Sequence, residues 1–414
     1  MAGWLPEEMG TRSPLPRRLC AALGIAVAAL ALSACGTTEY LSNQVNDMFT
    51  PASPPPQPMA PPPASSAIGA GQIRVGLILP LTAQGNAGVA AQSMKNAAEM
   101  ALAEFKNPNI QLLVKDDGGT PQGAQAGATQ AIAEGAEIII GPLFAEAVRA
   151  VGPVARQRGI PVIAFSTDVS VAARDVYLLS FLPETDVKRI VDYAISRGKR
   201  SFAALMPDSA YGGVVEAAFQ QEVSRRGGRI LALEKYPLDP GKLAEPARRV
   251  AQAAGRVDSI FIPDGPDAVP QVVRALVAGG VNLKRVQLLG TGIWADDQRI
   301  YSDTELDGGL YPAPEPGGYR SFAGRYRGRF GQEPVRTATL AYDAVALVAA
   351  LVKTQGAQRF SEQVLTNSSG FAGIDGVFRF RPDGTNERGL AVLRVTPSGG
   401  QVVSPAPKSF APGT

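Results

Sequence analysis

The stretch Ile73-Arg74-Val75-Gly76-Leu77-Ile78-Leu79 is a short apolar run that ends at Pro80, and apolar residues then recur at helical spacing from Ala87 to Phe105. The run predicts a buried strand, and the spacing after it predicts a helix. The same unit continues along the chain, with strands and helices predicted at 111–115, 124–134, 137–140, 145–156 and 161–165. Alternating strands and helices imply right-handed crossovers and a parallel sheet that is covered on both faces.

A second series of the same kind follows, without sequence identity to the first. We expect its helices and strands at 186–196, 202–206, 214–225, 229–236, 243–254, 259–262, 268–278 and 286–289. Beyond Gly308 the spacing predicts helices at 319–330, 337–354 and 361–366. Two alternating strands, 376–380 and 391–395, flank Pro382-Asp383-Gly384 and predict a hairpin-like end. The fold class is therefore α/β, built on two parallel sheets.

Composition restricts the function. The 414-residue chain is 45% hydrophobic and 19% charged, which suits a folded protein of two or three domains, and its net charge of +3 is too balanced for a nucleic-acid-binding surface. Histidine is absent, which excludes Ser-His-Asp triads, Cys-His pairs and imidazole metal sites. No phosphate-binding loop is present, and Gly290-Thr291-Gly292 is not continued as a dinucleotide fingerprint. We expect a binding protein and not an enzyme, with no cofactor, no metal and no nucleic-acid partner.

The N-terminal region has the pattern of a signal peptide. Arg17 and Arg18 precede a 14-residue apolar run, Leu19 to Leu32, which is shorter than the roughly 20 residues of a membrane-spanning helix. The run ends in Leu32-Ser33-Ala34-Cys35-Gly36, which resembles the lipobox of bacterial lipoproteins. This pattern predicts lipidation at Cys35 and a periplasmic protein that contacts a bacterial membrane through its lipid anchor only. An ordinary secretory signal is the alternative.

A proline-rich segment follows the predicted anchor. Residues 36–72 contain two charged side chains, and eight prolines lie between Pro51 and Pro63, so this segment cannot form a core and predicts a semi-rigid stalk. The expected organisation is a signal peptide at 1–34, a lipid anchor and stalk at 35–72, a folded region at 73–403 and a tail at 404–414.

Candidate binding residues follow the predicted strands, because ligands of open α/β sheets bind at the carboxyl ends of the strands. Polar or aromatic groups in these loops are offered by Thr82, Phe144, Ser166, Thr167, Asp168, Tyr211 and Asp264. The loop ending at Phe144 leads into a helix whose N–H groups can take a carboxylate. Turn formation, helix capping and aromatic packing are the alternative roles of these residues.

Several short motifs, taken in order, resemble the type I periplasmic solute-binding proteins of the Leu/Ile/Val-binding family. They are Ile73 to Pro80, Asp116-Asp117-Gly118, Ile139-Ile140-Gly141-Pro142, Ile160-Pro161-Val162-Ile163, Asp208…Tyr211-Gly212 and Gly373…Gly376-Val377-Phe378-Arg379-Phe380. The resemblance implies two Rossmann-like lobes that are joined by three crossing strands and close on a small ligand. It implies a first lobe of about 73–182 and 311–365 and a second of about 183–310 and 366–403.

The resemblance also implies a function. It makes the chain the substrate-binding component of an ABC transporter, with a permease as partner and an amino-acid-like solute as ligand. The family's carboxylate and ammonium contacts would fall on Phe144-Ala145, on Ser166 to Asp168 and on Tyr211. The first loop departs from the family pattern, because Phe144 stands where amino-acid binders usually offer a serine. The loss of one charge-assisted hydrogen bond weakens carboxylate binding by roughly tenfold to a hundredfold.

A second resemblance gives an alternative function. Gly141-Pro142-Leu143, Leu179 to Glu184 and Ala217-Ala218-Phe219…Gly227-Gly228 are similar to the solute-binding-like domain of outer-membrane lipoproteins that activate penicillin-binding proteins. In that case the chain would regulate peptidoglycan synthesis through protein–protein contacts, with a penicillin-binding protein as its partner.

Overall fold

The computed structural model describes residues 66–106, 108–237 and 239–410, which belong to the second of two compact units, Ser65–Thr414. The predicted signal peptide, the lipidation site Cys35 and most of the predicted stalk lie outside the described residues. No helix within the described ranges is both long enough and apolar enough to cross a membrane.

The first lobe is built on a six-stranded sheet of order β1-β3-β2-β4-β5-β6, in which only β1 is antiparallel to its neighbour. Its strands are β1 (Ser66–Ile68), β2 (Ile73–Leu79), β3 (Ile110–Asp116), β4 (Ala136–Ile140), β5 (Val162–Ala164) and β6 (Val176–Leu178). β1 lies inside the segment that we expect to be stalk, because its three residues pair with the open edge of β3.

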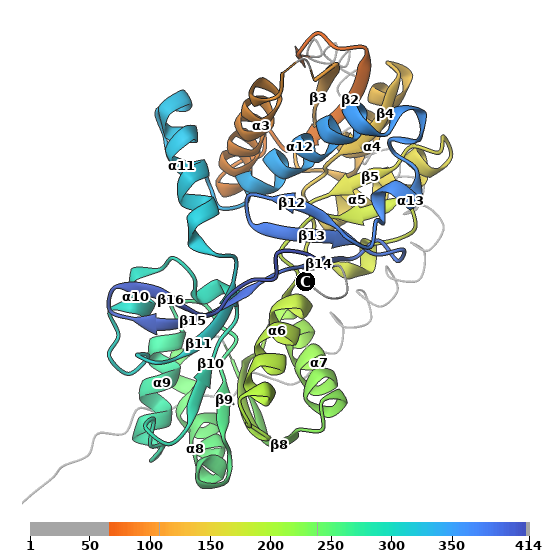
Figure 1. Cartoon of the computed structure of the whole chain (residues 1–414). Coiled ribbons are helices and arrows are strands. Elements are labelled where there is room, and N and C mark those ends of the chain that lie inside the picture. The colour runs from red at the N-terminus through yellow and green to blue at the C-terminus, as the bar shows by residue number, and fades with distance from the viewer. Residues whose placement is uncertain (1–65, 107, 238, 411–414) are drawn as a thin grey trace, which may run out of the picture. The chain divides into compact units, whose positions relative to one another are not determined.

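Helices cover both faces of this sheet, as a parallel sheet requires. One face packs against α3 (Asn86–Glu104) and α12 (Ala338–Thr354), which lie side by side in Figure 1. The other face packs against α4 (Pro121–Ala133) and α5 (Ala145–Arg156). Successive residues of β2 alternate between the two cores: Leu77 and Leu79 face the first pair of helices, and Ile78 faces the second.

The second lobe contains a seven-stranded sheet of order β16-β15-β11-β10-β9-β7-β8. Its strands are β7 (Ser201–Pro207), β8 (Arg229–Tyr236), β9 (Ser259–Phe261), β10 (Gln287–Leu289), β11 (Leu310–Ala313), β15 (Ala391–Thr396) and β16 (Gly399–Ser404). The pairs from β8 to β11 are parallel, whereas β15 and β16 add antiparallel strands at one edge. The sheet is covered by α6 (Pro183–Ser196) and α7 (Ala210–Arg225) on one face and by α8 (Ala244–Ala253) and α9 (Val269–Ala278) on the other.

A small antiparallel sheet completes the first lobe. It consists of β12 (Phe371–Gly373), β13 (Gly376–Phe380) and β14 (Asn386–Arg388), and Phe378 and Phe380 belong to the same core as α3 and α12. Three further helices complete the second half of the chain. In sequence, α10 (Gln298–Tyr301) lies between β10 and β11, α11 (Pro316–Phe330) lies between β11 and α12, and α13 (Glu362–Leu365) lies between α12 and β12.

The predicted pairing of the last two alternating strands is wrong. β13 pairs with β12 and β14, whereas β15 pairs with β11 and β16 in the other lobe. The turn at 382–384 therefore joins β13 to β14. Alternation shows which face of a strand is buried, but it does not show which strand lies alongside it.

Three segments connect the lobes, and we call them the crossing segments. They are residues 179–182 between β6 and α6, 314–315 between β11 and α11, and 389–390 between β14 and β15. The predicted fold class, two lobes with mainly parallel sheets joined by three crossings, is confirmed. The second and third crossings fall at different places from the expected 311 and 366, because β11 extends the second sheet and 371–388 pack on the first lobe.

The described end of the chain contacts both lobes. Arg189 of α6 donates a hydrogen bond to the Ser404 hydroxyl at 2.7 Å, and the Ala406 N–H donates to the Glu315 carboxylate at 3.0 Å. The Phe410 ring lies 4.6 Å from the guanidinium carbon of Arg379 in β13. Residues 405–410 thus run from the second sheet to the small sheet of the first lobe.

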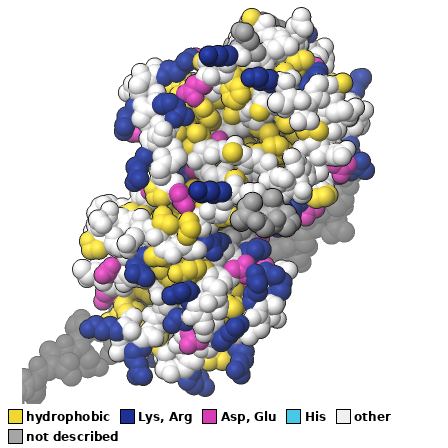
Figure 2. Space-filling model, viewed as in Figure 1, with side chains coloured by type: hydrophobic (Ala, Val, Ile, Leu, Met, Phe, Trp, Pro, Cys, Tyr) yellow, Lys and Arg dark blue, Asp and Glu magenta, His cyan; other side chains and the backbone are white. Residues whose placement is uncertain are grey.

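Exposed charged side chains occur on both lobes. On the face shown in Figure 2, Lys and Arg side chains are interspersed with acidic and neutral ones on both lobes. This arrangement agrees with the near-balance of charges in the sequence. It offers no continuous basic stripe on that face of the kind that follows a nucleic-acid backbone.

Candidate functional site

The first-lobe candidates Thr82 and Phe144 lie close together at the carboxyl edge of the sheet. Thr82 is exposed, and its N–H donates to the Asp116 carboxylate at 3.2 Å. Phe144 precedes α5 and is 39% exposed. A methyl group on Gly119 would lie 3.9 Å from the Phe144 ring and 3.3 Å from the loop after β2, so the loops that follow β2, β3 and β4 converge here.

The candidates Ser166, Thr167 and Asp168 form the turn after β5. Ser166 is buried, and its hydroxyl accepts the Asp168 N–H at 3.1 Å. The Asp168 carboxylate accepts the Ser170 N–H at 2.9 Å, and hydrogen bonds from Ser170 lower its pKa. Ser166 and Asp168 therefore hold this turn in shape, which is the role that capping residues play. Thr167 presents an exposed side chain.

The second-lobe candidates Tyr211 and Asp264 both follow strands of the second sheet. Tyr211 lies in the first turn of α7, and its hydroxyl shares a hydrogen bond with the Thr291 hydroxyl at 2.9 Å. Burial raises the pKa of Tyr211, so the phenol keeps its proton. The Asp264 carboxylate accepts hydrogen bonds from the Tyr236 hydroxyl and from the Gly265 N–H. These two donors fix Asp264 in its loop.

Tyr211 opens onto a cavity of about 460 Å³ that we call the aromatic cavity. It is lined by Phe181, Pro183, Asp186, Tyr211, Gly292, Ile293, Ala295, Asp296, Ala313, Pro314, Glu315, Pro316, Tyr319 and Arg336. Both lobes and two crossing segments contribute to it. Of the binding residues expected from the sequence, Tyr211 is the one that lines this cavity within the described chain. That Tyr211 and the 166–168 turn contact the same ligand, as the resemblance implies, stays a prediction.

Asp186 is a half-buried acid of the aromatic cavity. It lies in the first turn of α6, and its Oδ2 accepts the N–H of Gly292 at 2.8 Å. Its Oδ1 has no hydrogen-bond partner among the described residues. Burial raises the pKa of Asp186 to about 7, although the Gly292 amide acts to lower it. The carboxyl group therefore titrates near neutral pH.

Arg336 is the cation of the aromatic cavity. Its two Nη atoms donate to both oxygens of the buried Asp375, at 3.0 and 2.6 Å. Its guanidinium carbon lies 4.9 Å from the Phe181 ring centre and 4.6 Å from that of Tyr319. Burial acts to lower the pKa of Arg336, but the hydrogen bonds to Asp375 outweigh it and raise the pKa. The charge is thus neutralised within the protein, and the planar group forms part of an aromatic wall.

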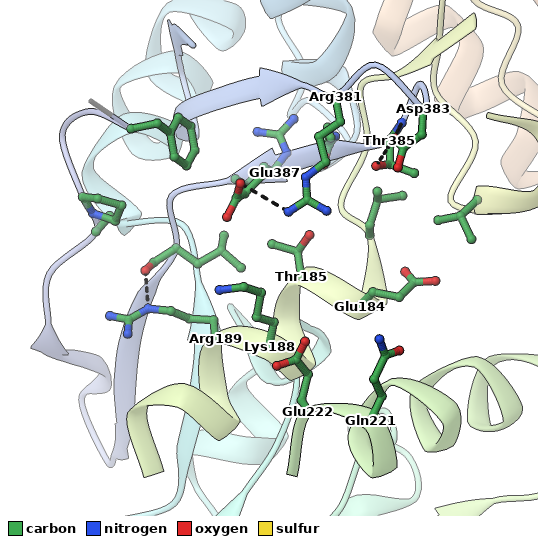
Figure 3. A pocket seen from close by; sticks show the side chains of 18 of the residues that line it. Glu184, Thr185, Lys188, Arg189, Gln221, Glu222, Arg381, Asp383, Thr385 and Glu387 are labelled. Atoms are coloured by element: carbon green, nitrogen blue, oxygen red, sulfur yellow. Dashed lines mark hydrogen bonds and ion pairs between the residues drawn. The ribbon is translucent and has the colours of Figure 1, made fainter. Parts of the chain in front are cut away.

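A second cavity, of about 750 Å³, lies on the opposite face of the first crossing segment, and we call it the charged cavity (Figure 3). Successive residues of this segment line the two cavities in turn. Phe181 and Pro183 line the aromatic cavity, whereas Leu182 and Glu184 line the charged cavity. Its labelled polar side chains are Glu184, Thr185, Lys188, Arg189, Gln221, Glu222, Arg381, Asp383, Thr385 and Glu387.

Four of the eight charged side chains that line the charged cavity form ion pairs within the described residues. Lys188 pairs with Asp192 at 3.0 Å, and Glu222 pairs with Arg225. Glu387 pairs with Arg381 at 3.3 Å and with a second arginine, Arg379, at 2.7 Å. No group of three or more Asp, Glu, His or Cys side chains within the described residues is placed to hold a metal ion.

Sequence reasoning missed Asp186, Tyr319 and Arg336. Asp186 stands in the first turn of a predicted helix, where an acid ordinarily stabilises the helix N-terminus and gives no sign of a cavity. Tyr319 reads as a residue of an ordinary helix. Arg336 lies in an irregular loop between α11 and α12, where no spacing rule applies. The first crossing segment is the signal that could have indicated the cavity. Phe181 and Pro183 belong to the motif Leu179 to Glu184, which is similar to the activator lipoproteins.

Comparisons with known proteins agree with this architecture. A model of the periplasmic binding protein family matches residues 72–401. A Leu/Ile/Val-binding protein homolog of Brucella melitensis biotype 1 is 22% identical over 238 residues, which are 55% of this chain and 60% of that protein. The chain therefore matches less than two thirds of this curated relative's length.

Two solved structures have the same fold. A Rhodospirillum rubrum protein, described as a branched-chain amino acid ABC transporter, has a TM-score of 0.71 at 19% identity, with 80% of this chain and 99% of that chain covered. An ABC transporter substrate-binding protein from Desulfitobacterium hafniense, solved in complex with Leu, has a TM-score of 0.57 at 18% identity, with 80% and 99% covered. With its two lobes, three crossing segments and a family match over most of its length, the chain belongs to the type I periplasmic binding proteins of the Leu/Ile/Val-binding family.

Proposed function

We propose that this protein binds one small amino-acid-like solute between its lobes and delivers it to the permease of an ABC transporter. The observation that carries the proposal is the aromatic cavity, to which both lobes and two crossing segments contribute. Its volume of about 460 Å³ is in the range of small-molecule sites, and its walls are mainly apolar with a few polar groups, as such sites usually are.

The loops at the carboxyl edge of the first sheet form the other half of the proposed binding surface. Thr82, Phe144 and Thr167 have exposed side chains there, and we propose that they cover the solute when the lobes close. Phe144 supplies an apolar contact in this arrangement. Ser166 and Asp168 support the shape of their turn and leave Thr167 free to reach the solute.

The proposed setting is the periplasm, the compartment expected for this family. Lipidation of Cys35 would anchor the chain to a bacterial membrane, and the stalk would let the lobes reach the permease. The relatives named above are described as a Leu/Ile/Val-binding protein homolog, a branched-chain amino acid ABC transporter and an ABC transporter substrate-binding protein. They do not support the alternative role as an activator of penicillin-binding proteins.

The solute proposal is tested by native mass spectrometry of the full chain purified without denaturation. We expect a retained small molecule that is lost on partial unfolding and refolding. Deletion of the gene should abolish uptake of that molecule, and restoration with Tyr211→Ala should rescue it poorly. An empty cleft, normal uptake of every solute tested and new sensitivity to cell-wall antibiotics on deletion would favour the activator role instead.

The anchor is tested separately with Cys35→Ala. We expect the variant to leave the membrane fraction or to accumulate as an uncleaved precursor. Unchanged membrane association, normal processing and no incorporated lipid label would exclude the anchor without affecting the solute proposal.

A further inference from the structure

The charged cavity is separate from the proposed solute site, and both lobes line it. Helices α6 and α7 of the second lobe contribute to it, and so do β14 and the turn before β14 in the first lobe. Its volume of about 750 Å³ is in the range of sites for small organic molecules. The cavity therefore has room for a second ligand, and its charges indicate the class of that ligand.

Two carboxylates of the charged cavity are already held by arginines. Glu387 pairs with Arg379 at 2.7 Å and with Arg381 at 3.3 Å. Glu222 pairs with Arg225, which lies one turn further along α7. The negative charge of both acids is thus neutralised within the protein.

The other two carboxylates lie apart from most of the cations. Asp383 accepts the N–H of Thr385 at 2.8 Å and its hydroxyl at 2.6 Å, which fixes the carboxylate in its turn. Burial raises the pKa of Glu184 and so favours the neutral form of that side chain. In Figure 3 both acids lie on the right, whereas Lys188 and Arg189 lie on the left. We call the left part the cationic end, and no carboxylate of its described lining is without an ion pair.

Cations outnumber carboxylates around the cationic end. Lys188 pairs with Asp192 at 3.0 Å, but Arg225 and Arg226 pair with the same carboxylate. Glu387 is likewise shared by two arginines. Because one carboxylate balances the charge of one cation only, both of these networks retain positive charge.

Two further arginines of the lining have no carboxylate partner within the described ranges. Arg189 donates to the Leu390 carbonyl and to the Ser404 hydroxyl, each at 2.7 Å. Arg388 is 4% exposed, and its Nε donates to the Ser180 carbonyl at 2.9 Å, whereas its two Nη atoms have no hydrogen-bond partner in the described structure. A buried cation without a counter-charge is costly, and an anion in the cavity would lower that cost.

The donors that a ligand can reach come from both lobes. Figure 3 shows Arg381 extending from the first lobe toward Thr185 of α6, and Lys188 lies one turn further along this helix. The Arg381 and Lys188 side chains are 44% and 38% exposed. The side chains of Thr185 and Gln221 form no hydrogen bond within the described part of the chain. Guanidinium, ammonium and hydroxyl groups together form a donor set that suits an oxyanion.

We propose that the cationic end of the charged cavity is a second binding site, which takes a small organic phosphate monoester. A phosphate monoester carries about −1.5 to −2 charges at pH 7, which suits a site with more than one unbalanced cation. Its three terminal oxygens accept hydrogen bonds from Arg381, Lys188 and Thr185. The organic part lies against the apolar side chains of Leu182 and Leu390, which belong to the same lining.

Isothermal titration calorimetry of the full chain at about pH 7.5 tests the proposal with three probes that share one aromatic ring. They are phenyl phosphate, which is a dianion, benzenesulfonate, which is a monoanion with three oxygens, and benzylamine, which is a cation. We expect phenyl phosphate to bind at least about fivefold more tightly than benzenesulfonate, because its second charge meets a second cation. Benzylamine should not compete with phenyl phosphate.

Variants at the cationic end show whether the probe binds there. Lys188→Met and Arg381→Met should each weaken phenyl phosphate binding by about threefold to tenfold, the lower part of the range for a charge-assisted hydrogen bond, since both side chains are partly exposed. Lys235→Met and Arg249→Met are the matched controls, because these exposed cations pair with acids outside the cavity. Tyr211→Ala, which alters the aromatic cavity, should leave the affinity for phenyl phosphate unchanged.

Four results would overturn the inference. They are no binding of phenyl phosphate, equal binding of phenyl phosphate and benzenesulfonate, unchanged affinity in the Lys188→Met and Arg381→Met variants, and a larger loss in Tyr211→Ala than in either of them. The last result would place the probe in the aromatic cavity. None of these results bears on retention of the natural solute, so the proposed function is tested separately. Should Lys188→Met fail to fold, Arg381→Met and the probe series still decide the question, because Glu387 keeps Arg379 as its partner in that variant.

Discussion

The two cavities on either side of the first crossing segment differ in how their charges are balanced. The charged cavity is the larger, at about 750 Å³ against about 460 Å³, and it contains many more ionisable side chains. Its lining contains four acids and four bases, and Arg381 and Glu387 pair with each other in Figure 3. The aromatic cavity has fewer charges, and Asp186 has no counter-ion among the described residues. A titratable group in a cavity whose pKa is shifted by burial is a sign of a functional site.

The arrangement follows from the extended backbone of the crossing segment. Side chains alternate along it, so Phe181 faces one cavity and Leu182 the other. Phe181 is also held between two guanidinium groups, with Arg336 at 4.9 Å and Arg388 at 4.6 Å from its ring centre. Arg336 lines the aromatic cavity and Arg388 lines the charged one. A single ring thus separates two electrostatically different spaces.

The largest effect is expected from removing a charge that has no substitute. Arg336→Met leaves Asp375 buried without its partner, which should lower the free energy of unfolding by about 3–5 kcal/mol. Arg381→Met in the charged cavity is the control, because Glu387 keeps Arg379, and the loss should be within about 1 kcal/mol. Urea denaturation measures both. Equal losses in the two variants would contradict the distinction between the cavities.

The next effect tests the ring between the cavities. Phe181→Ala removes the surface on which both guanidinium groups stack and should lower the free energy of unfolding by about 2–3 kcal/mol, somewhat below the cost at a fully buried phenylalanine. Phe144→Ala provides a matched control, since Phe144 is 39% exposed and should cost less than about 1 kcal/mol. A Phe181 variant as stable as the Phe144 variant would show that the ring does not hold the crossing segment.

The third effect concerns pH. The unfolded chain releases the Asp186 proton near pH 3.8 and the folded chain near pH 7, so between these values the folded state binds the extra proton. Raising the pH through this window should therefore lower the free energy of unfolding, by about 1–2 kcal/mol once partial access to solvent is considered. Asp186→Asn should lack this part of the pH dependence. Asp343, whose pKa burial also raises to about 7, is unchanged in the variant, so the difference between the two curves isolates Asp186. Parallel curves would show that Asp186 does not titrate in this range.

The sequence predicted the regular parts of the fold well, for physical reasons. Helix α5 and strand β8 were expected at 145–156 and 229–236 and are found there, since a strong apolar period extends over enough residues to be read. The short strand β6 was missed because three residues contain no period. The pairing of β13 and β15 was misjudged because partner choice depends on contacts far along the chain.

The site was predictable where it follows a strand and not where it depends on the crossing segments. Tyr211 was identified because it opens a helix at the carboxyl edge of the sheet. Arg336 reaches the cavity from a loop distant in sequence from Phe181, and Asp186 resembles an ordinary helix-start acid. Their importance comes from what surrounds them in space, such as Gly292 beside Asp186, and no local pattern reports that.

The smallest effect is expected near the end of the described chain, where the tail lines the charged cavity through Pro405, Ala406, Pro407 and Phe410. Phe410→Ala removes the ring beside Arg379 and should lower the free energy of unfolding by about 0.5–1 kcal/mol, the usual contribution of an exposed contact between a cation and a ring. Binding of the solute should be unchanged, because Phe410 does not belong to the lining of the aromatic cavity. Calorimetry on the variant with the retained solute checks this, and Ser398→Ala, in the exposed turn between β15 and β16, serves as a control for surface change. A solute affinity that falls more than threefold in Phe410→Ala would mean that the two cavities are coupled through the tail, and the separation of their roles would have to be given up.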